Sequence, residues 1–582
     1  MSLYSAESAS PSRSFLKGAF ILTIGMVIVK FCGLLQKVLL TNLYSTLGES
    51  YGEFGSGLFA NAYEIYVPLF TLATIGFPVA LSRMISESYA RRHYSRVHRV
   101  FCVARPFFIV TGTICFLLMA VGSFWYVRYI DSPYSLMAML IMSPTILFGC
   151  LISVYRGYFE GLRDMTPTSV SEIMEAIAKI AVGVTLSYFV VNKGVREYSL
   201  YGTVFNLNVS DKDEAFRTIV AFSVAASILG ITFGSVISFV YLRLLYMKRK
   251  KLIPEEREES FVSPTDKEIF FSMFRMAIPV GIGTLFMSFA GSLDAAMLNR
   301  ILRNMSTQVP EKLLSQYPLL RDEIFVSGTA HTCIWGYYSS CLTIYSIVAA
   351  VTQVLGTSAL PNVTNAFAKG DRAQLKSSIE TVIRISAIFA FPCGLGLCVL
   401  AKPILSLVYF ANPNIALYGT PVLQVLGISS AFFGICTPLC SMLQGIGKAA
   451  KTMTICITGT VLKVIVSFFF AQNISVNIAG TAIGSVVSAV FMSVTAMYYL
   501  LKYTGVRFDY LAVLLKPFVS SLICALCAYV CYYIFSLNVL ISVVISAILY
   551  AVFLLILHTF SKNEIEKVLN CKKIVIILEK HR

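Results

Sequence analysis

Long apolar runs, separated by short polar stretches, recur along almost the whole chain. A helix needs about 20 predominantly apolar residues to cross the hydrocarbon core of a bilayer, and most of these runs reach that length. They predict an all-α polytopic membrane protein with about fourteen spanning helices, arranged as two pseudo-symmetric six-helix bundles followed by two further helices. The predicted spans are 16–36, 58–85, 101–127, 134–155, 170–191 and 217–246, then 270–301, 332–360, 377–408, 417–444, 453–472 and 478–501, then 516–536 and 538–560.

These runs divide the chain into six parts. We expect an N-terminal tail at 1–15, a first bundle at 16–246, a charged linker at 247–269, a second bundle at 270–501, two additional helices within 502–560 and a basic tail at 561–582.

One helical hairpin occurs twice, about half a protein apart. A shift of 284 positions pairs Gly161 with Gly445 and Lys179 with Lys463, without a gap between them. A turn and a new helix with a buried Lys, repeated in this way, indicate a duplicated transport domain. Because the repeat returns after six spans, both halves have the same orientation. A cleft between the two bundles is therefore expected near the middle of the membrane.

Composition supports a membrane protein. The chain is 57% hydrophobic and only 13% charged, with a mean hydropathy of +0.75, whereas soluble domains carry about 25% charged residues. The net charge of +17 lies in short loops beside the apolar runs, which indicates membrane topology rather than nucleic-acid binding. Most of the fifteen Cys lie inside apolar runs and are expected to be small core residues. Cys524 and Cys527 have no His nearby, which disfavours a metal site.

Loop charges predict the orientation of the bundle. Lys and Arg gather in alternate loops, whereas the opposite stretches 48–57, 410–417, 473–477 and 536–538 contain neither residue. By the positive-inside rule the basic loops and both termini are expected to be cytoplasmic. Two longer outside loops, near 192–216 and 302–331, are expected to form small caps.

Charged residues within the spans are candidate binding residues, because a charge near the bilayer centre is costly. Lys30 is assigned to the cleft, whereas Lys37 is interpreted as an anchor at the membrane boundary. Glu64 either marks that boundary or faces the cleft. The candidate residues of the central cavity are Lys30, Glu64, Glu172, Glu175, Lys179, Asp294, Arg300 and Lys463.

Spacing adds detail to this set. Glu172, Glu175 and Lys179 share one helical face, so Glu175 and Lys179 either neutralise each other or contact a ligand directly. Lys463 has no acidic residue at the corresponding positions of its own helix.

Two prolines and two arginines are candidate gate or hinge residues. Pro78 and Pro361 lie near the cytoplasmic ends of equivalent helices, where a proline bends the segment. Arg83 and Arg156 also lie near cytoplasmic ends, where they form gate ion pairs or extend to the membrane surface.

Signatures of other classes are missing from the sequence. It contains no G-x-x-x-x-G-K-[ST] motif, the five His show no metal-ligand spacing, and no span repeats Arg at every third position. We therefore expect neither an enzyme nor a voltage-gated channel. No cofactor is expected; Na⁺, H⁺ or the membrane potential are the candidate driving forces.

Three motifs resemble a known family. They are Lys17-Gly-Ala-Phe-Ile-Leu-Thr-Ile-Gly25 with Val29-Lys-Phe-Cys-Gly33, Gly76-Phe-Pro-Val-Ala-Leu-Ser-Arg83, and Arg156-Gly-Tyr-Phe-Glu-Gly161 with Met165-Thr-Pro-Thr-Ser169. Over nearly its whole length the chain resembles the polysaccharide-transporter branch of the multidrug/oligosaccharidyl-lipid/polysaccharide exporter (MOP) superfamily. The likeness is greatest to its lipid II flippases and stage V sporulation proteins.

The resemblance implies a flippase of a bacterial cell membrane. It would move a polyprenyl-pyrophosphate-linked glycan, lipid II above all, to the outer leaflet by alternating access. Lys30, Lys179 and Lys463 would bind the pyrophosphate, and Glu175 and Asp294 the sugars and peptide. Membrane lipids and cell-wall synthesis proteins are the implied partners. One departure is that 70–76 and 345–356 contain no Arg, where Gram-negative flippases place one.

Two alternatives stay open. An ion-coupled drug exporter of the same fold would bind small cations in acidic pockets, and a membrane scaffold would have no transport role. Fourteen helices where that exporter would have twelve, together with the basic cavity candidates, argue against the drug exporter, whereas the scaffold would tolerate loss of both Lys179 and Lys463.

Overall fold

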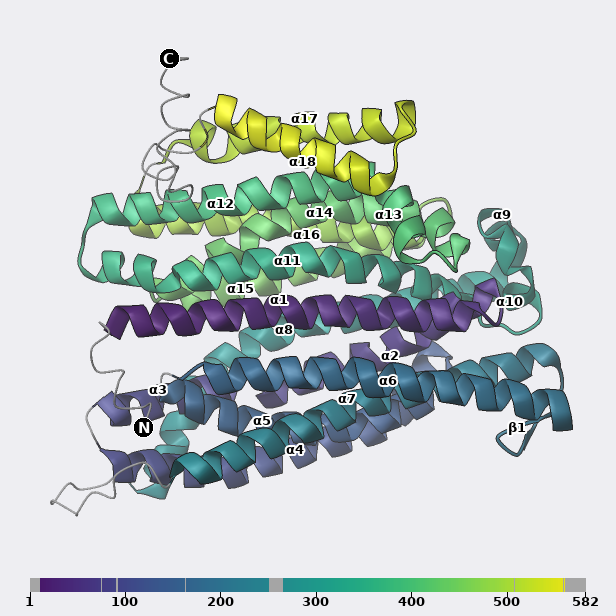
Figure 1. The fold of residues 1–582 in the computed structure, drawn as a ribbon, viewed down its shortest axis with the longest axis horizontal. Coiled ribbons are helices and arrows are strands. Elements are labelled where there is room, and N and C mark those ends of the chain that lie inside the picture. The colour runs from purple at the N-terminus through teal and green to yellow at the C-terminus, as the bar shows by residue number, and fades with distance from the viewer. Residues whose placement is uncertain are drawn as a thin grey trace.

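The computed structural model describes residues 11–557, apart from 75, 91–92, 163, 251–264 and 507, together with residue 559. Long helices run side by side through nearly all of this part of the chain (Figure 1). The sheet found among the described residues is a short antiparallel hairpin of two strands, β1 (Thr203–Val204) and β2 (Leu207–Asn208). The predicted all-α class is confirmed.

The first bundle contains the first seven helices. They are α1 (Pro11–Ser45), α2 (Glu49–Thr74), α3 (Gly76–Ala90), α4 (Tyr94–Ile130), α5 (Leu136–Gly161), α6 (Thr166–Tyr201) and α7 (Lys212–Lys250), with a 3₁₀ turn at Pro133–Ser135.

The second bundle begins after the charged linker. Its helices are α8 (Asp266–Gln308), α9 (Pro310–Gln316), α10 (Arg321–Phe325), α11 (Ala330–Ala368), α12 (Arg372–Val399), α13 (Ala401–Val408), α14 (Pro413–Gly445), α15 (Ala449–Ala471) and α16 (Ile478–Thr504), with a 3₁₀ turn at Pro318–Leu320. The last two spans are α17 (Lys516–Tyr529), flanked by π-helical turns at Leu511–Leu515 and Val530–Ile534, and α18 (Val539–Ile556).

Figure 1 shows how the bundles sit. Helices α4 to α7 form one side of the molecule and α11, α12, α14 and α16 the other, with α1 and α8 between them. The last pair, α17 and α18, lies at the far edge, where α17 packs on α12. We call the end that carries β1, β2, α9 and α10 the cap end, and the end where α1 begins and α7 finishes the tail end.

Twelve helical segments of the described chain are long and apolar enough to cross a membrane. Helix α2 is not among them, because polar residues such as Asn61 and Glu64 interrupt its apolar run, and the apolar run of α8 includes side chains that lie outside the described residues. Both have spanning length and lie inside the bundle, and adding them to the twelve gives the fourteen predicted spans.

The structure corrects the expected loop at 48–57. Helix α2 begins at Glu49, so this stretch is helical, and Glu53 is fully buried instead of exposed. The predicted apolar span began only at residue 58, yet the four Gly and two Ser of this stretch permit close packing. A Cβ at Gly57 would lie 2.1 Å from the backbone oxygen of Thr332, and one at Gly336 would lie 2.0 Å from that of Glu53. Small residues thus let α2 and α11 touch backbone to backbone.

The duplicated hairpin has the same surroundings in each half. Gly161 ends α5 and Gly445 ends α14, each just before the turn into the next helix. Helix α6 then packs on α1 and α7, and its counterpart α15 packs on α8 and α16. Helices α1 and α8 thus hold equivalent places. Both also reach across the molecule, α1 to α11 and α8 to α2.

Candidate functional site

The first bundle places two lysines without an acidic partner on neighbouring helices. Lys179 of α6 donates a hydrogen bond of 3.3 Å to the hydroxyl of Tyr63, and its ammonium lies 5.8 Å from the centre of that ring. Lys30 of α1 is exposed and close enough to Lys179 for the two charges to repel. Within the described residues, neither lysine has a carboxylate at ion-pair distance. Together they make this part of the first bundle electropositive.

Arg156 neutralises Glu172 and Glu175, the two carboxylates that share a helical face with Lys179. Its guanidinium lies 3.2 Å from Glu175 and 3.6 Å from Glu172, and its Nε donates to the Ser171 hydroxyl at 3.0 Å. Ser235 of α7 donates a further hydrogen bond of 3.0 Å to Glu175. Mutual neutralisation of Glu175 and Lys179 is therefore not what the structure shows. Arg156 links α5 to α6, which leaves Lys179 available to a ligand.

Lys463, the repeat counterpart of Lys179, has a different environment. Its ammonium lies 2.5 Å from the carboxylate of Asp294 on α8. Asp294 is 2% exposed, so this ion pair is largely excluded from solvent. The sequence showed no acidic neighbour for Lys463 because only its own helix could be inspected, whereas the partner comes from the helix packed against it. Equivalent lysines are thus unpaired in the first bundle and paired in the second.

Glu64 lies between the bundles rather than at the lipid boundary. The backbone oxygen of Glu64 on α2 accepts a hydrogen bond from the Ser292 hydroxyl on α8. Its carboxylate faces Gly291, where an added Cβ would lie 2.7 Å from Oε2. Asp294 and Lys463 are near enough to act on it electrostatically. Two interpretations of Glu64 were left open, the membrane boundary and the cleft. The structure places its side chain inside the protein.

Lys37 is not a boundary anchor, contrary to expectation. Its ammonium donates to the Ser339 backbone oxygen at 2.7 Å and to the Ser339 hydroxyl at 3.2 Å. Ser339 belongs to α11, so Lys37 joins the first helix of one bundle to the other bundle. Helical packing of α1 against α11, which the sequence alone does not show, gives this lysine a partner within the protein.

Further polar contacts between the bundles gather at the cap end. Glu53 of α2 accepts hydrogen bonds from the Tyr337 hydroxyl, at 2.7 Å, and from the Asn412 amide. Arg217 of α7 lies 3.4 Å from Glu323 of α10 and also donates to Thr329. We call these six residues the cap-end contacts. These contacts could not be predicted from local sequence patterns, because each pair joins segments more than 100 positions apart.

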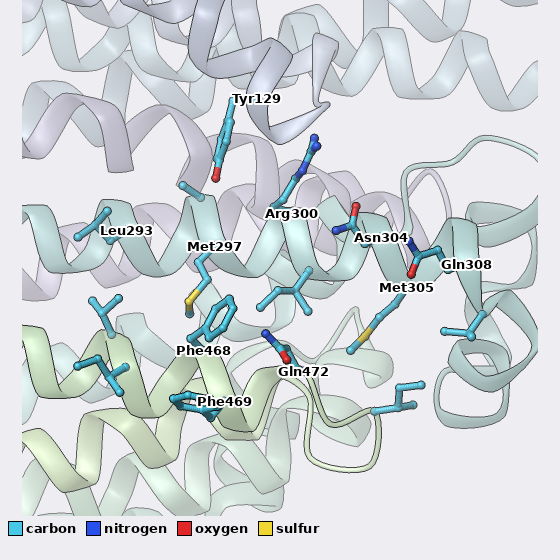
Figure 2. Close-up of a pocket in the computed structure, with 16 residues that line it drawn as sticks. Tyr129, Leu293, Met297, Arg300, Asn304, Met305, Gln308, Phe468, Phe469 and Gln472 are labelled. Atoms are coloured by element: carbon cyan, nitrogen blue, oxygen red, sulfur yellow. The ribbon is translucent and has the colours of Figure 1, made fainter.

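The remaining predicted residues lie elsewhere. Arg300 is exposed on α8, 5.9 Å from the centre of the Tyr129 ring, in a cavity apart from Asp294 (Figure 2). Pro78 is the third residue of α3, directly after the end of α2 at Thr74, and Arg83 is exposed on α3. The side chain of Pro361 lies outside the described residues. In the described part of the chain, no group of His, Cys, Asp and Glu could hold a metal ion.

Comparisons with known proteins agree with this architecture. Residues 15–210 match the family described as Polysaccharide biosynthesis protein, and residues 322–469 match the MatE family. The lipid II flippase MurJ of Bacillus subtilis is 21% identical over 495 residues, which is 82% of each chain. Stage V sporulation protein B of the same organism is 20% identical over 83% of this chain and 82% of its own length.

Solved structures share the fold. A lipid II flippase MurJ in an inward closed conformation aligns with a TM-score of 0.61, 14% identity, and coverage of 93% of this chain and 99% of its own. An inward-facing multidrug resistance transporter of the MATE family aligns with a TM-score of 0.59 and 12% identity, over 82% of this chain and 98% of its own. The fold and the families thus define a multi-pass membrane transporter. In its two matched families and in its fold the chain is similar to transporters of the MOP superfamily.

Proposed function

We propose that this protein is a flippase that moves a polyprenyl-pyrophosphate-linked glycan, with lipid II as the leading candidate, across a bacterial cell membrane. The observation that carries the proposal is the pair Lys30 and Lys179, which lies between helices without a carboxylate partner in the described chain. A pyrophosphate is a compact polyanion, and ammonium groups bind its oxygens through strong charge-assisted hydrogen bonds. Tyr63 adds a hydroxyl and an aromatic face at the same place.

The hydrocarbon tail has a separate place in this proposal. An apolar cavity of about 480 Å³ lies between α11 and α12 on one side and the two extra helices, α17 and α18, on the other. Ile344, Ile388 and Pro392 line it, with Tyr550 of α18 opposite. A prenyl chain can lie there at the edge of the second bundle while its charged headgroup crosses within the cleft.

The cap-end contacts supply the closed state of an alternating-access cycle. Glu53 and Arg217 hold the bundles together at this end, while Lys30 stays exposed. The loop charges make the cap end the outer face and the tail end the cytoplasmic one. In this arrangement the headgroup enters from the cytoplasm. Separation of the cap-end contacts then opens the cleft to the other side.

The charge balance of the cleft disfavours a drug exporter. Such a transporter would offer acidic groups to cationic drugs, yet Arg156 pairs with Glu172 and Glu175, and Lys463 pairs with Asp294. Lys30 and Lys179, which have no carboxylate partner within the described chain, repel a cation.

Native mass spectrometry of the detergent-purified protein tests the proposal. Wild type is compared with Lys30→Ala and Lys179→Ala in the presence of lipid II and other polyprenyl-pyrophosphate glycans. Lys402→Ala is the matched control, because Lys402 is exposed on α13 and distant from the cleft in sequence and fold. Loss of one charged contact should weaken lipid II binding about tenfold. Equal and weak binding of every glycan lipid to all four proteins would refute the proposal.

A further inference from the structure

A second binding surface lies along the exposed face of α8, outside the cleft. It is a groove of about 790 Å³, bordered by Tyr129 of α4 on one side and by the outer half of α15 on the other. Figure 2 shows Tyr129 and Arg300 on one side of α8, and Phe468, Phe469 and Gln472 of α15 on the other. The groove therefore spans both bundles, because α4 belongs to the first and α15 to the second.

The polar residues of the groove lie toward the cap end, where Met305 and Val309 also line it. On α8, Leu293 and Met297 are followed on the same face by Arg300, Asn304 and Gln308. The polar part extends about 12 Å along the helix, at 1.5 Å per residue. On α15 the apolar residues Phe468 and Phe469 are likewise followed by Gln472. Polar groups from both sides of the groove thus gather toward the cap end, where a lipid headgroup can lie beyond its acyl chains.

Arg300 carries the charge of this groove. Its guanidinium lies 5.9 Å from the centre of the Tyr129 ring, and it has no carboxylate at ion-pair distance within the described chain. Arg303, one turn further on, shows the contrast, because it lies 2.6 Å from the carboxylate of Asp131. Arg303 is satisfied within the protein, whereas the donors of Arg300 remain available to an external anion.

We propose that this groove binds the phosphodiester headgroup of an anionic membrane phospholipid, with Arg300 on the phosphate and the acyl chains against Met297 and Phe468. One guanidinium flanked by the amides of Asn304 and Gln308 matches a singly charged phosphodiester. A pyrophosphate carries more charge and would require two cations, as the cleft provides in Lys30 and Lys179. The lipid would contact both bundles beside the Arg303–Asp131 ion pair and so favour the closed cap end.

Lipid titration of the purified full-length protein tests the site. Phosphatidylglycerol is added to delipidated protein and the bound fraction is measured by native mass spectrometry, with zwitterionic phosphatidylcholine as the comparison lipid. We expect one tightly retained phosphatidylglycerol, and a loss of affinity of about tenfold in Arg300→Gln. Arg128→Gln is the matched control, because Arg128 is an exposed arginine of α4 beside Tyr129 that does not line the groove.

A second variant tests the groove independently, in case Arg300→Gln misfolds. Met297→Trp keeps Arg300 and fills the apolar part of the groove, so it should also weaken retention of phosphatidylglycerol. The site would be refuted if Arg300→Gln and Arg128→Gln lost affinity for phosphatidylglycerol equally, or if neither groove variant lost any. Displacement of phosphatidylglycerol by a polyprenyl-pyrophosphate glycan would also refute it. The double variant Lys30→Ala/Lys179→Ala should keep this lipid, which separates the test from that of the proposed function.

Discussion

The ammonium of Lys463 lies 2.5 Å from the carboxylate of Asp294, deep between α15 and α8. In the other half of the duplicated fold, Lys179 occupies the equivalent position and contacts a tyrosine hydroxyl instead. The ion pair neutralises the second bundle at this depth, while the first bundle keeps its positive charge. Under the proposed function, the first half supplies the binding site and the second a structural support.

Removal of one member of the buried pair should be costly. Asp294→Asn leaves the ammonium of Lys463 without a counter-charge, and loss of one partner of a buried pair typically costs about 3–5 kcal/mol of folding free energy. Unfolding of the purified protein in denaturant measures this loss. The double variant Asp294→Leu/Lys463→Met should recover most of the stability, because neither charge then remains buried. A double variant as unstable as the single one would show that the pair is not the cause.

The cap-end contacts should control which face of the transporter is closed. Glu53→Gln replaces a carboxylate that accepts from Tyr337 and Asn412, so the closed cap end loses a charge-assisted hydrogen bond. We expect the population to shift about tenfold toward an open cap end. Spin labels are attached at the exposed residues Leu200 and Val326 in a cysteine-free background. The distance between them, measured by electron paramagnetic resonance, reports this shift.

The matched control for that experiment is Glu311→Gln. Glu311 is an exposed carboxylate of α9 at the same end of the molecule, so its loss should leave the distance distribution unchanged. An unchanged distribution in Glu53→Gln would show that the contact does not hold the bundles together.

Close helix packing should be equally sensitive at one glycine. Gly336→Ala places a Cβ 2.0 Å from the backbone oxygen of Glu53, so α11 must move away from α2. Overpacking of this kind costs typically about 1–3 kcal/mol, which thermal unfolding of the detergent-purified protein should reveal as a lower midpoint. Gly122→Ala, where an added Cβ meets nothing within 4 Å, is the control and should be neutral. Equal midpoints for the two variants would contradict the packing described here.

Tyr63 should tune the binding pocket more weakly than the lysines do. Tyr63→Phe removes the hydroxyl that Lys179 contacts but keeps the ring and its stacking on Phe59, whose centre lies 4.9 Å away. Because both lysines remain, affinity for lipid II should fall only a few-fold, against about tenfold for Lys179→Ala. Titrations of both variants in the same mass-spectrometric assay compare them. A larger loss in Tyr63→Phe would assign the main contact to the hydroxyl.

The spanning helices could be predicted because run length and polarity are local properties of the sequence. The pairing of charges could not. Spacing along one helix suggested Glu175 as the partner of Lys179, yet Arg156 reaches Glu175 from the preceding helix. Lys463 lacked a partner for the same reason, since Asp294 lies on another helix. Glu53 was assigned to a loop because the predicted apolar span began only at residue 58, whereas α2 begins at Glu49.

The repeat, in contrast, correctly marked two equivalent positions. Lys179 and Lys463 lie on equivalent helices with equivalent neighbours, as the shift of the sequence implied. What differs between them comes from α1 and α8, whose own likeness is too weak to align. Long-range packing, rather than the local pattern, therefore determines which lysine stays available.

Transport in reconstituted vesicles tests the central claim most directly. Labelled lipid II is placed in one leaflet, and its appearance in the other is followed for wild type, Lys30→Ala/Lys179→Ala and the control Lys402→Ala. We predict translocation by wild type and Lys402→Ala, and loss of most of it in the double variant at equal protein incorporation. Undiminished translocation by the double variant would contradict the claim that these two lysines bind the headgroup.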